Sequence, residues 1–151
     1  MLNAGMKWET LPDDVKRAFI GQQAELREFL AGTQFYKFTD RPLLGSGSYV
    51  TPWWSGVDPL DSSDPGLNGV HARAQDLGVD PAKFARARSG VTLQWNSMTG
   101  LLVVQLIQPV CGFVGRCSHQ RMDAGDPKVV FIGGGWQVYV PNLTPNHVLQ
   151  V

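Results

Sequence analysis

The pattern of apolar positions divides the chain into a helical beginning and a β-rich remainder. Between residues 12 and 30 the apolar side chains recur at the spacing of one helix face: Val15, Phe19, Leu26, Phe29 and Leu30. Thr10 suits the N-cap of such a helix, Pro12 its first turn and Gly32 its end. The sequence therefore predicts an N-terminal helix from about Pro12 to Leu30.

Later segments alternate apolar and polar residues, or are runs of β-branched and aromatic residues, as strands are. QFYKF at 34–38 is the first of them. From Val91 on, five more follow between turn residues: VTLQW, LLVVQLIQPV, KVVFI, WQVYV and HVLQV. A loop rich in Gly, Pro, Ser and Asp is expected at 55–69, and a short second helix at 80–88. Helix first and strands after predict an α+β fold with a largely antiparallel sheet.

No repeat or linker divides the 151 residues, so the chain is expected to be a single domain. Its helical segment would be residues 1–33 and its β-rich core residues 34–151. The core would hold the functional residues, because the polar motifs described next all lie within it.

Charge and composition narrow the classes of function. Thirteen basic and thirteen acidic residues cancel, which argues against a general nucleic-acid binder. No apolar run approaches the roughly 20 residues that cross a bilayer, and the N-terminus lacks a signal-peptide pattern, so we expect no membrane partner. Delivery as part of a larger secreted protein stays open, and the cellular location is not predicted. Cys111 and Cys117 stand without a Cys/His cluster, so no metal site is expected; they are either buried thiols or a small disulfide loop.

The first candidate site is FYKFTDRPLLGSGSYVTPWW, residues 35–54. Lys37 lies in a predicted strand and Arg41 follows it, so either cation could meet an anionic ligand. A Gly-Ser turn then leads to further polar and aromatic side chains that could bind a planar ring: Ser48, Tyr49, Thr51 and Trp54. The alternative is structural, with Lys37 solvated and Trp53 and Trp54 anchoring the core.

The second candidate site is FIGGGWQVYVPNL, residues 131–143. In a strand over 136–140, Trp136 and Val138 share one face and Gln137 and Tyr139 the other. Three consecutive glycines, including Gly134 and Gly135, permit a close approach of a ligand or of neighbouring backbone. The alternative is a β-bulge or wide turn with Gln137 exposed.

Together the order of a basic strand residue, G-x-Y-x-[ST] and G-G-G-x-Q resembles NAD glycohydrolases of the tuberculosis necrotizing toxin type. GSYVT (47–51) and GGGWQ (133–137) carry the likeness, which spans about residues 34–151. The resemblance implies an ADP-ribosyltransferase-like split β-sheet core, with Gln137 as the catalytic residue. It expects an arginine where Lys37 stands, a part that Arg41 could take.

The resemblance further implies that NAD or NADP is the substrate and that no cofactor is needed. Ser48 and the neighbouring glycine amides, with Lys37 or Arg41, would hold the pyrophosphate, and Tyr49 or Trp54 would pack on nicotinamide. Protein-modifying ADP-ribosyltransferases use a late glutamate, but all three glutamates of this chain precede residue 30. Because glutamine has no ionisable proton, hydrolysis is favoured over transfer. Gln137 would bind the ribose, and Thr51, Gly134 and Gly135 would line the site.

We therefore expect a toxin or bacterial effector domain that hydrolyses NAD(P), with a cognate immunity protein as its protein partner. Two alternatives stay open: an ADP-ribosyltransferase, and a non-catalytic binding module of the immunity or adaptor type. A binding module would expose an apolar patch in place of a closed polar cleft.

Overall fold

The computed structural model describes residues 1–39, 44, 50–81, 84, 100–118, 120–121, 130–131 and 135–151. Arg41, Ser48, Tyr49 and Gly134 lie outside these residues, as do the predicted strand at 91–95 and most of the predicted helix at 80–88. Within the described part the fold is α+β, with two α-helices and a seven-stranded antiparallel sheet, as the sequence predicted in outline.

The sheet has the strand order β1-β5-β8-β3-β2-β4-β9. The bounds are as follows: β1 Glu25–Phe29, β2 Gln34–Thr39, β3 Trp53–Gly56, β4 Gly100–Leu106, β5 Val110–Arg116, β8 Trp136–Tyr139 and β9 Val148–Gln150. A separate short pair joins β6, Gln120–Arg121, to β7, Val130–Phe131. The run 101–110, predicted as one strand, is divided between β4 and β5 by a turn at 107–109.

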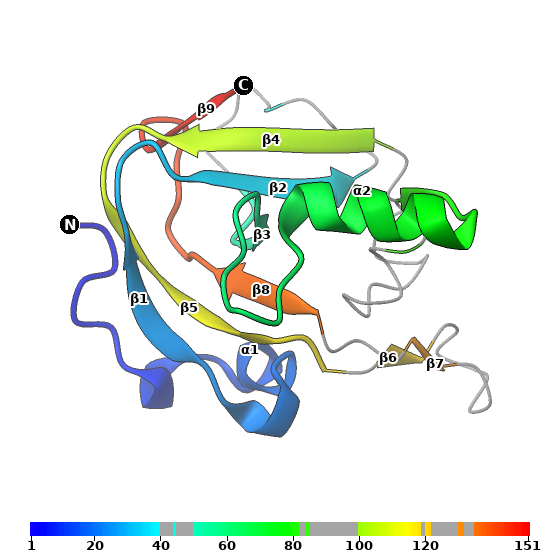
Figure 1. The fold of residues 1–151 in the computed structure, drawn as a ribbon. Coiled ribbons are helices and arrows are strands. Elements are labelled where there is room, and N and C mark those ends of the chain that lie inside the picture. The colour runs from blue at the N-terminus through cyan, green and yellow to red at the C-terminus, as the bar shows by residue number, and fades with distance from the viewer. Residues whose placement is uncertain are drawn as a thin grey trace.

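Two ribbons turn a corner side by side and bend the sheet (Figure 1). One ribbon is β1 followed by β2, the other is β4 followed by β5, and β1 pairs with β5 while β2 pairs with β4. Reciprocal backbone hydrogen bonds hold the ribbons together at the corner, from Gly32 N to Leu106 O (2.8 Å) and from Leu106 N to Thr33 O (2.9 Å). Strands β8 and β3 connect the two halves.

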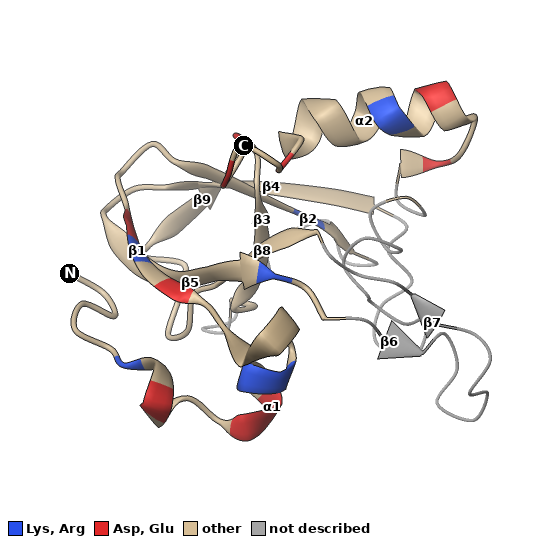
Figure 2. Ribbon diagram, turned by 60° about the horizontal axis from the view of Figure 1, so that its bottom comes forward, with Lys and Arg blue, Asp and Glu red and all other residues tan. Residues whose placement is uncertain are grey.

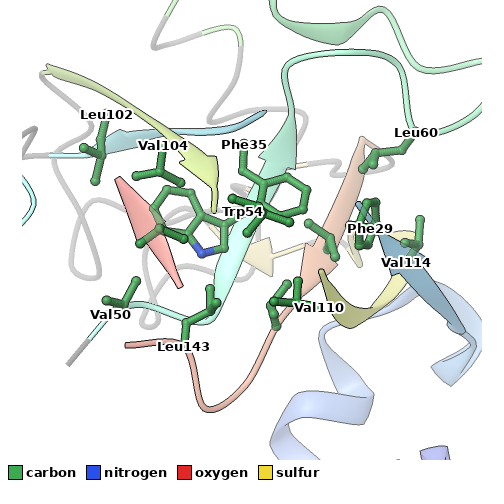
Figure 3. Close-up of a cluster of buried hydrophobic side chains, with 14 residues drawn as sticks. Phe29, Phe35, Val50, Trp54, Leu60, Leu102, Val104, Val110, Val114 and Leu143 are labelled. Carbon is green, nitrogen blue, oxygen red and sulfur yellow. The ribbon is translucent and has the colours of Figure 1, made fainter. Parts of the chain in front are cut away.

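The main core lies on one side of this sheet, which we call the inner face (Figure 3). Trp54, 2% exposed, packs there with Phe35, Val104 and Val138. Removing such side chains from water is the principal stabilising contribution, at about 25 cal/mol per Å² of apolar surface. The inner face is therefore filled by packed side chains along the strands that carry the sequence motifs.

The opposite side, the outer face, has two covers. Helix α2, Gly66–Leu77, lies over β2 and β4 (Figure 1), where Leu67 and Val70 pack on Tyr36 and Phe38. The N-terminal segment, residues 1–24, covers β5, β8 and β3, and its Phe19 packs with Phe113 and Trp53. Acidic and basic positions are mixed along the ribbon around α1 (Figure 2).

The predicted N-terminal helix is shorter than expected. Helix α1 runs only from Asp13 to Arg17 and is flanked by the 3-10 turns η1, Trp8–Thr10, and η2, Ile20–Gln22. Residues 25–29 form β1, in register with β5 from Glu25 opposite Val114 to Phe29 opposite Val110. The helical prediction for residues 18–30 is thus wrong, because pairing with β5 and burial of Phe29 in the main core outweigh the helical spacing.

The first residues of the chain are hydrogen-bonded to β5 and to the segment that follows β8. Leu2 forms a bridge with Val110, and Asn3 Nδ2 donates to the backbone oxygens of Cys111 (3.1 Å) and Pro141 (2.7 Å). Asn142 Nδ2 donates in turn to Asn3 Oδ1, at 3.1 Å. The N-terminal segment is therefore an integral layer of the domain.

None of the helices described is long and apolar enough to span a bilayer. The described residues also contain no group of three or more His, Cys, Asp or Glu side chains that could hold a metal ion. Cys111 and Cys117 are both buried and free. The structure therefore has two buried thiols and not the small disulfide loop that the sequence left open.

Candidate functional site

The motif segments lie on three neighbouring strands. Lys37 is on β2, Thr51 lies two residues before β3, Gly135 immediately precedes β8, and Gln137 is the second residue of β8. Strand β3 pairs with β2 on one side and with β8 on the other. The fold therefore brings segments separated by about a hundred residues into the middle of one sheet.

Lys37 and Thr51 are in direct contact. The Nζ of Lys37 donates a hydrogen bond of 3.0 Å to Oγ1 of Thr51. The same hydroxyl accepts the Trp53 N–H at 3.4 Å, and the Thr51 carbonyl accepts Nε1 of Trp54 at 2.8 Å. Thr51 thus links the ammonium group of Lys37 on β2 to the first two residues of β3.

Trp54 is a core residue in this arrangement. Its ring is buried on the inner face and its indole N–H is bonded to Thr51. A ligand at the surface would meet almost none of this side chain. Its interpretation as a core anchor, left open by the sequence, is the one that the packing favours.

Gln137 lies on the outer face, opposite Gly115 of β5. Its Nε2 donates a hydrogen bond of 3.0 Å to the carbonyl oxygen of Ala18, at the end of α1. The same carbonyl accepts the backbone N–H of Ser118 at 2.9 Å. Among the described residues no donor contacts Oε1, the acceptor end of this half-buried amide.

The predicted division of β8 into two faces is confirmed. Val138 is fully buried in the main core, while Tyr139 packs on Trp53 under the N-terminal segment. Trp136 shares the face of Val138 but is only half-buried: its Nε1 donates to Ser63 Oγ at 2.8 Å. The guanidinium carbon of Arg116 lies 5.8 Å from its ring centroid.

The structure separates two groups that the sequence placed in one site. Lys37 is two positions from Phe35 along β2 and therefore lies on the same, inner face, whereas Gln137 lies on the outer face. Because β3 and β8 are antiparallel, Thr51 before β3 and Gly135 before β8 also lie at opposite ends of the pair. One small ligand group therefore cannot touch both Lys37 and Gln137 in this arrangement.

The loop after β3 is ordered by its own carboxylates. Asp61 Oδ1 accepts the Ser63 N–H and the hydroxyls of Ser63 and Ser62. The backbone N–H of Ser63 is the main cause that lowers the pKa of Asp61 below its ordinary value of 3.8. Asp64 accepts the N–H groups of Leu60 and Gly66 and so shapes the entry to α2. These bonds account for the carboxylates as loop structure.

No protein-family model matches this sequence, and a search of curated proteins finds no match to it. The functional argument therefore depends on the geometry of the strands and on the motifs they carry.

Proposed function

We propose that the protein is an NAD(P) glycohydrolase that cleaves the bond between nicotinamide and ribose, and that it acts as a toxin or effector domain. The observation that carries the proposal is the oriented amide of Gln137, at the middle of the sheet, whose donor end is bound and whose acceptor end meets no donor among the described residues. The adjacency of β2, β3 and β8 supports it, because it brings the segments that carry the resemblance together in one sheet.

Cleavage of the nicotinamide–ribose bond needs no strongly acidic side chain. When the C1′–N bond of NAD breaks, its electron pair passes to the positively charged pyridinium nitrogen and nicotinamide leaves neutral, so no strong general acid is required. The ribose is left as an oxocarbenium ion, to which water adds with release of one proton. A glutamine that accepts a hydrogen bond from a ribose hydroxyl would fix the sugar through this step.

The separation of Lys37 from Gln137 refines the assignment. Gln137 acts at the ribose on the outer face. Lys37, if it binds the dinucleotide, contacts a phosphate away from the breaking bond, where Arg41 and Ser48 of the resemblance would also act, while Tyr49 would pack on nicotinamide. Trp54 is removed from the proposed contacts, because its ring belongs to the core.

The test is to incubate the purified protein with NAD and with NADP and to follow loss of each. Wild-type protein should consume at least one of them, and Gln137→Ala should lower the rate by at least about 100-fold, the scale of losing one positioned polar contact. Gln108→Ala is the matched control, because the amide of Gln108 also donates to a backbone carbonyl, that of Asn146, at an exposed turn (3.1 Å). Folded wild-type protein that leaves both dinucleotides intact over hours would refute the proposal.

A non-catalytic binding module of the immunity or adaptor type is the second candidate. The observation that favours it is a set of exposed apolar side chains on one side of the β4–β9 pair: Leu101, Leu149 and Val151. Exposed apolar surface of this kind marks protein-binding faces. The same assay separates the two candidates, since a binding module leaves NAD and NADP unchanged. An ADP-ribosyltransferase would also consume NAD, but would leave ADP-ribose on a protein acceptor.

A further inference from the structure

The carbonyl of Ala18 determines which way the Gln137 amide points. A carbonyl oxygen can only accept, so the group 3.0 Å from it must be the NH₂ of the amide and not its oxygen. Oε1 is therefore the end of the amide that does not bond to the Ala18 oxygen.

The Ala18 carbonyl is itself held rigidly. Phe19, 1% exposed, packs against Trp8 and Trp53 and forms a β-bridge with Cys117. Gly115 makes this approach feasible, because a Cβ at that position would lie 2.7 Å from both Gln23 O and Phe19 Cδ1. The residue that pairs with Gln137 is thus the one whose missing side chain lets the N-terminal segment close over the strand.

We propose that the Ala18 carbonyl is a positioning group: it holds Gln137 so that the amide presents only an acceptor to the substrate. This inference rests on the proposed NAD(P) glycohydrolase function and deepens it. An acceptor-only tip binds a neutral hydroxyl, such as those of the ribose next to the breaking bond, and repels a phosphate oxygen, which is itself an acceptor. The substrate group at Gln137 is thus a neutral donor, for which the proposal assigns a ribose hydroxyl, and not a phosphate.

The same contact explains why the strand carries glutamine and not glutamate. An ionised carboxylate has no proton to donate, so it would face the Ala18 oxygen as a second acceptor. A protonated carboxyl group, by contrast, can donate to Ala18 and still offer its other oxygen to a ribose hydroxyl. The variant Gln137→Glu therefore mimics the wild-type geometry only in its acid form.

The experiment measures the rate of NAD cleavage by Gln137→Glu relative to that by wild type, from about pH 4.5 to about pH 8. This range includes the pKa expected of a glutamate carboxyl whose pKa is raised by a hydrogen bond that only its protonated form can donate. The ratio should fall at least about tenfold as the pH rises. A ratio that rises with pH, as it would if a carboxylate bound the ribose directly, overturns the positioning role, as does a ratio independent of pH.

Other charges near the contact are accounted for by the comparison with wild type. Arg17 adjoins Ala18, and Arg116 lies on β5 beside Gly115; both are arginines, whose charge is constant over this range. Gln108→Glu places the same charge at the exposed turn and should leave the ratio flat.

A second readout needs no substrate. The protonated carboxyl of Gln137→Glu bonds to Ala18 only in the folded protein, which raises its folded pKa above the unfolded value of about 4.3. Its stabilisation is thus complete below the unfolded pKa and is lost as pH rises through the folded pKa. The urea midpoint of the variant should fall relative to wild type over this interval, and a constant difference overturns the contact. A pH-dependent midpoint in a protein whose wild type cleaves neither dinucleotide overturns the proposed function, and with it the positioning of a ribose.

Discussion

Lys37 on β2 and Thr51, just before β3, are joined by a 3.0 Å hydrogen bond between Nζ and Oγ1. This bond joins β2 to the segment that leads into β3. Lys37 lies on the opposite face of the sheet from Gln137. It therefore either binds a phosphate at a separate place or has the structural role of joining β2 to the segment before β3.

The variant Lys37→Ala separates these two roles. If Lys37 binds a phosphate of the dinucleotide, the KM for NAD should rise while kcat stays within about threefold, because such a contact stabilises ground and transition states alike. Thr51→Val is the matched change, since it removes the acceptor but keeps the ammonium. A KM unchanged in Lys37→Ala would assign the residue to structure alone.

Trp136→Ala should destabilise the protein by about 1–3 kcal/mol, below the 3–5 kcal/mol typical of a fully buried tryptophan. The reason is that its ring is only half-buried, with its N–H on Ser63 and Arg116 beside it. Urea unfolding followed by far-UV circular dichroism gives the value. A loss near 5 kcal/mol would show that the ring is enclosed.

Gly115→Ala should cost about 1–3 kcal/mol, because the added methyl group meets Gln23 O and Phe19 and forces the N-terminal segment outward. Gly78→Ala is the comparison: a Cβ there meets nothing within 4 Å, so only its φ of 67° is penalised, by about 1 kcal/mol. Hydrogen exchange of residues 18–23 should accelerate in Gly115→Ala and not in Gly78→Ala. Equal effects of the two changes would contradict the close packing at Gly115.

Asp61 gives a pH dependence with a definite sign. Its pKa is lowered in the folded protein, chiefly by the Ser63 N–H, so the loop is stabilised above the unfolded value of 3.8 and loses that stabilisation as pH falls through the folded pKa. Ser63→Ala removes only the hydroxyl bond and should return the pKa part of the way, as NMR titration of the carboxyl would show. A pKa unchanged by this substitution would leave the backbone N–H as the sole donor that matters.

The strands near the C-terminus could be predicted because their alternation is local. WQVYV and HVLQV form β8 and β9 as expected, and the two faces of β8 were correctly distinguished. Alternation reports which residues share a face, and it needs no knowledge of the partner strand. It cannot report on which side of the sheet a second motif lies, which is why Lys37 and Gln137 were placed in one site.

One predicted helix was too long and one helix was not predicted, for different reasons. Residues 25–29 have helical spacing, but long-range pairing with β5 makes them a strand. Helix α2 was missed because the polar run before it suggested a loop through residue 69. Its signals were present: Asp64 and Pro65 at the start, Leu67, Val70 and Ala74 on one face, and Gly78 in the left-handed conformation at the end. The contact of Gln137 with Ala18 had no sequence signal, since a backbone carbonyl carries none.

The hydrogen bonds of Asn3 affect the order in which contacts can form while the chain is being synthesised. A ribosome releases the N-terminal segment first, yet the groups that bind Asn3 belong to residues 108 and 138 positions later. During synthesis Leu2 and Asn3 can therefore form these contacts only after Val110, Cys111 and Pro141 have been made. Contacts of such long sequence separation slow folding, and until they form, the apolar surface of β5 and β8 stays open to nascent-chain chaperones or to neighbouring chains.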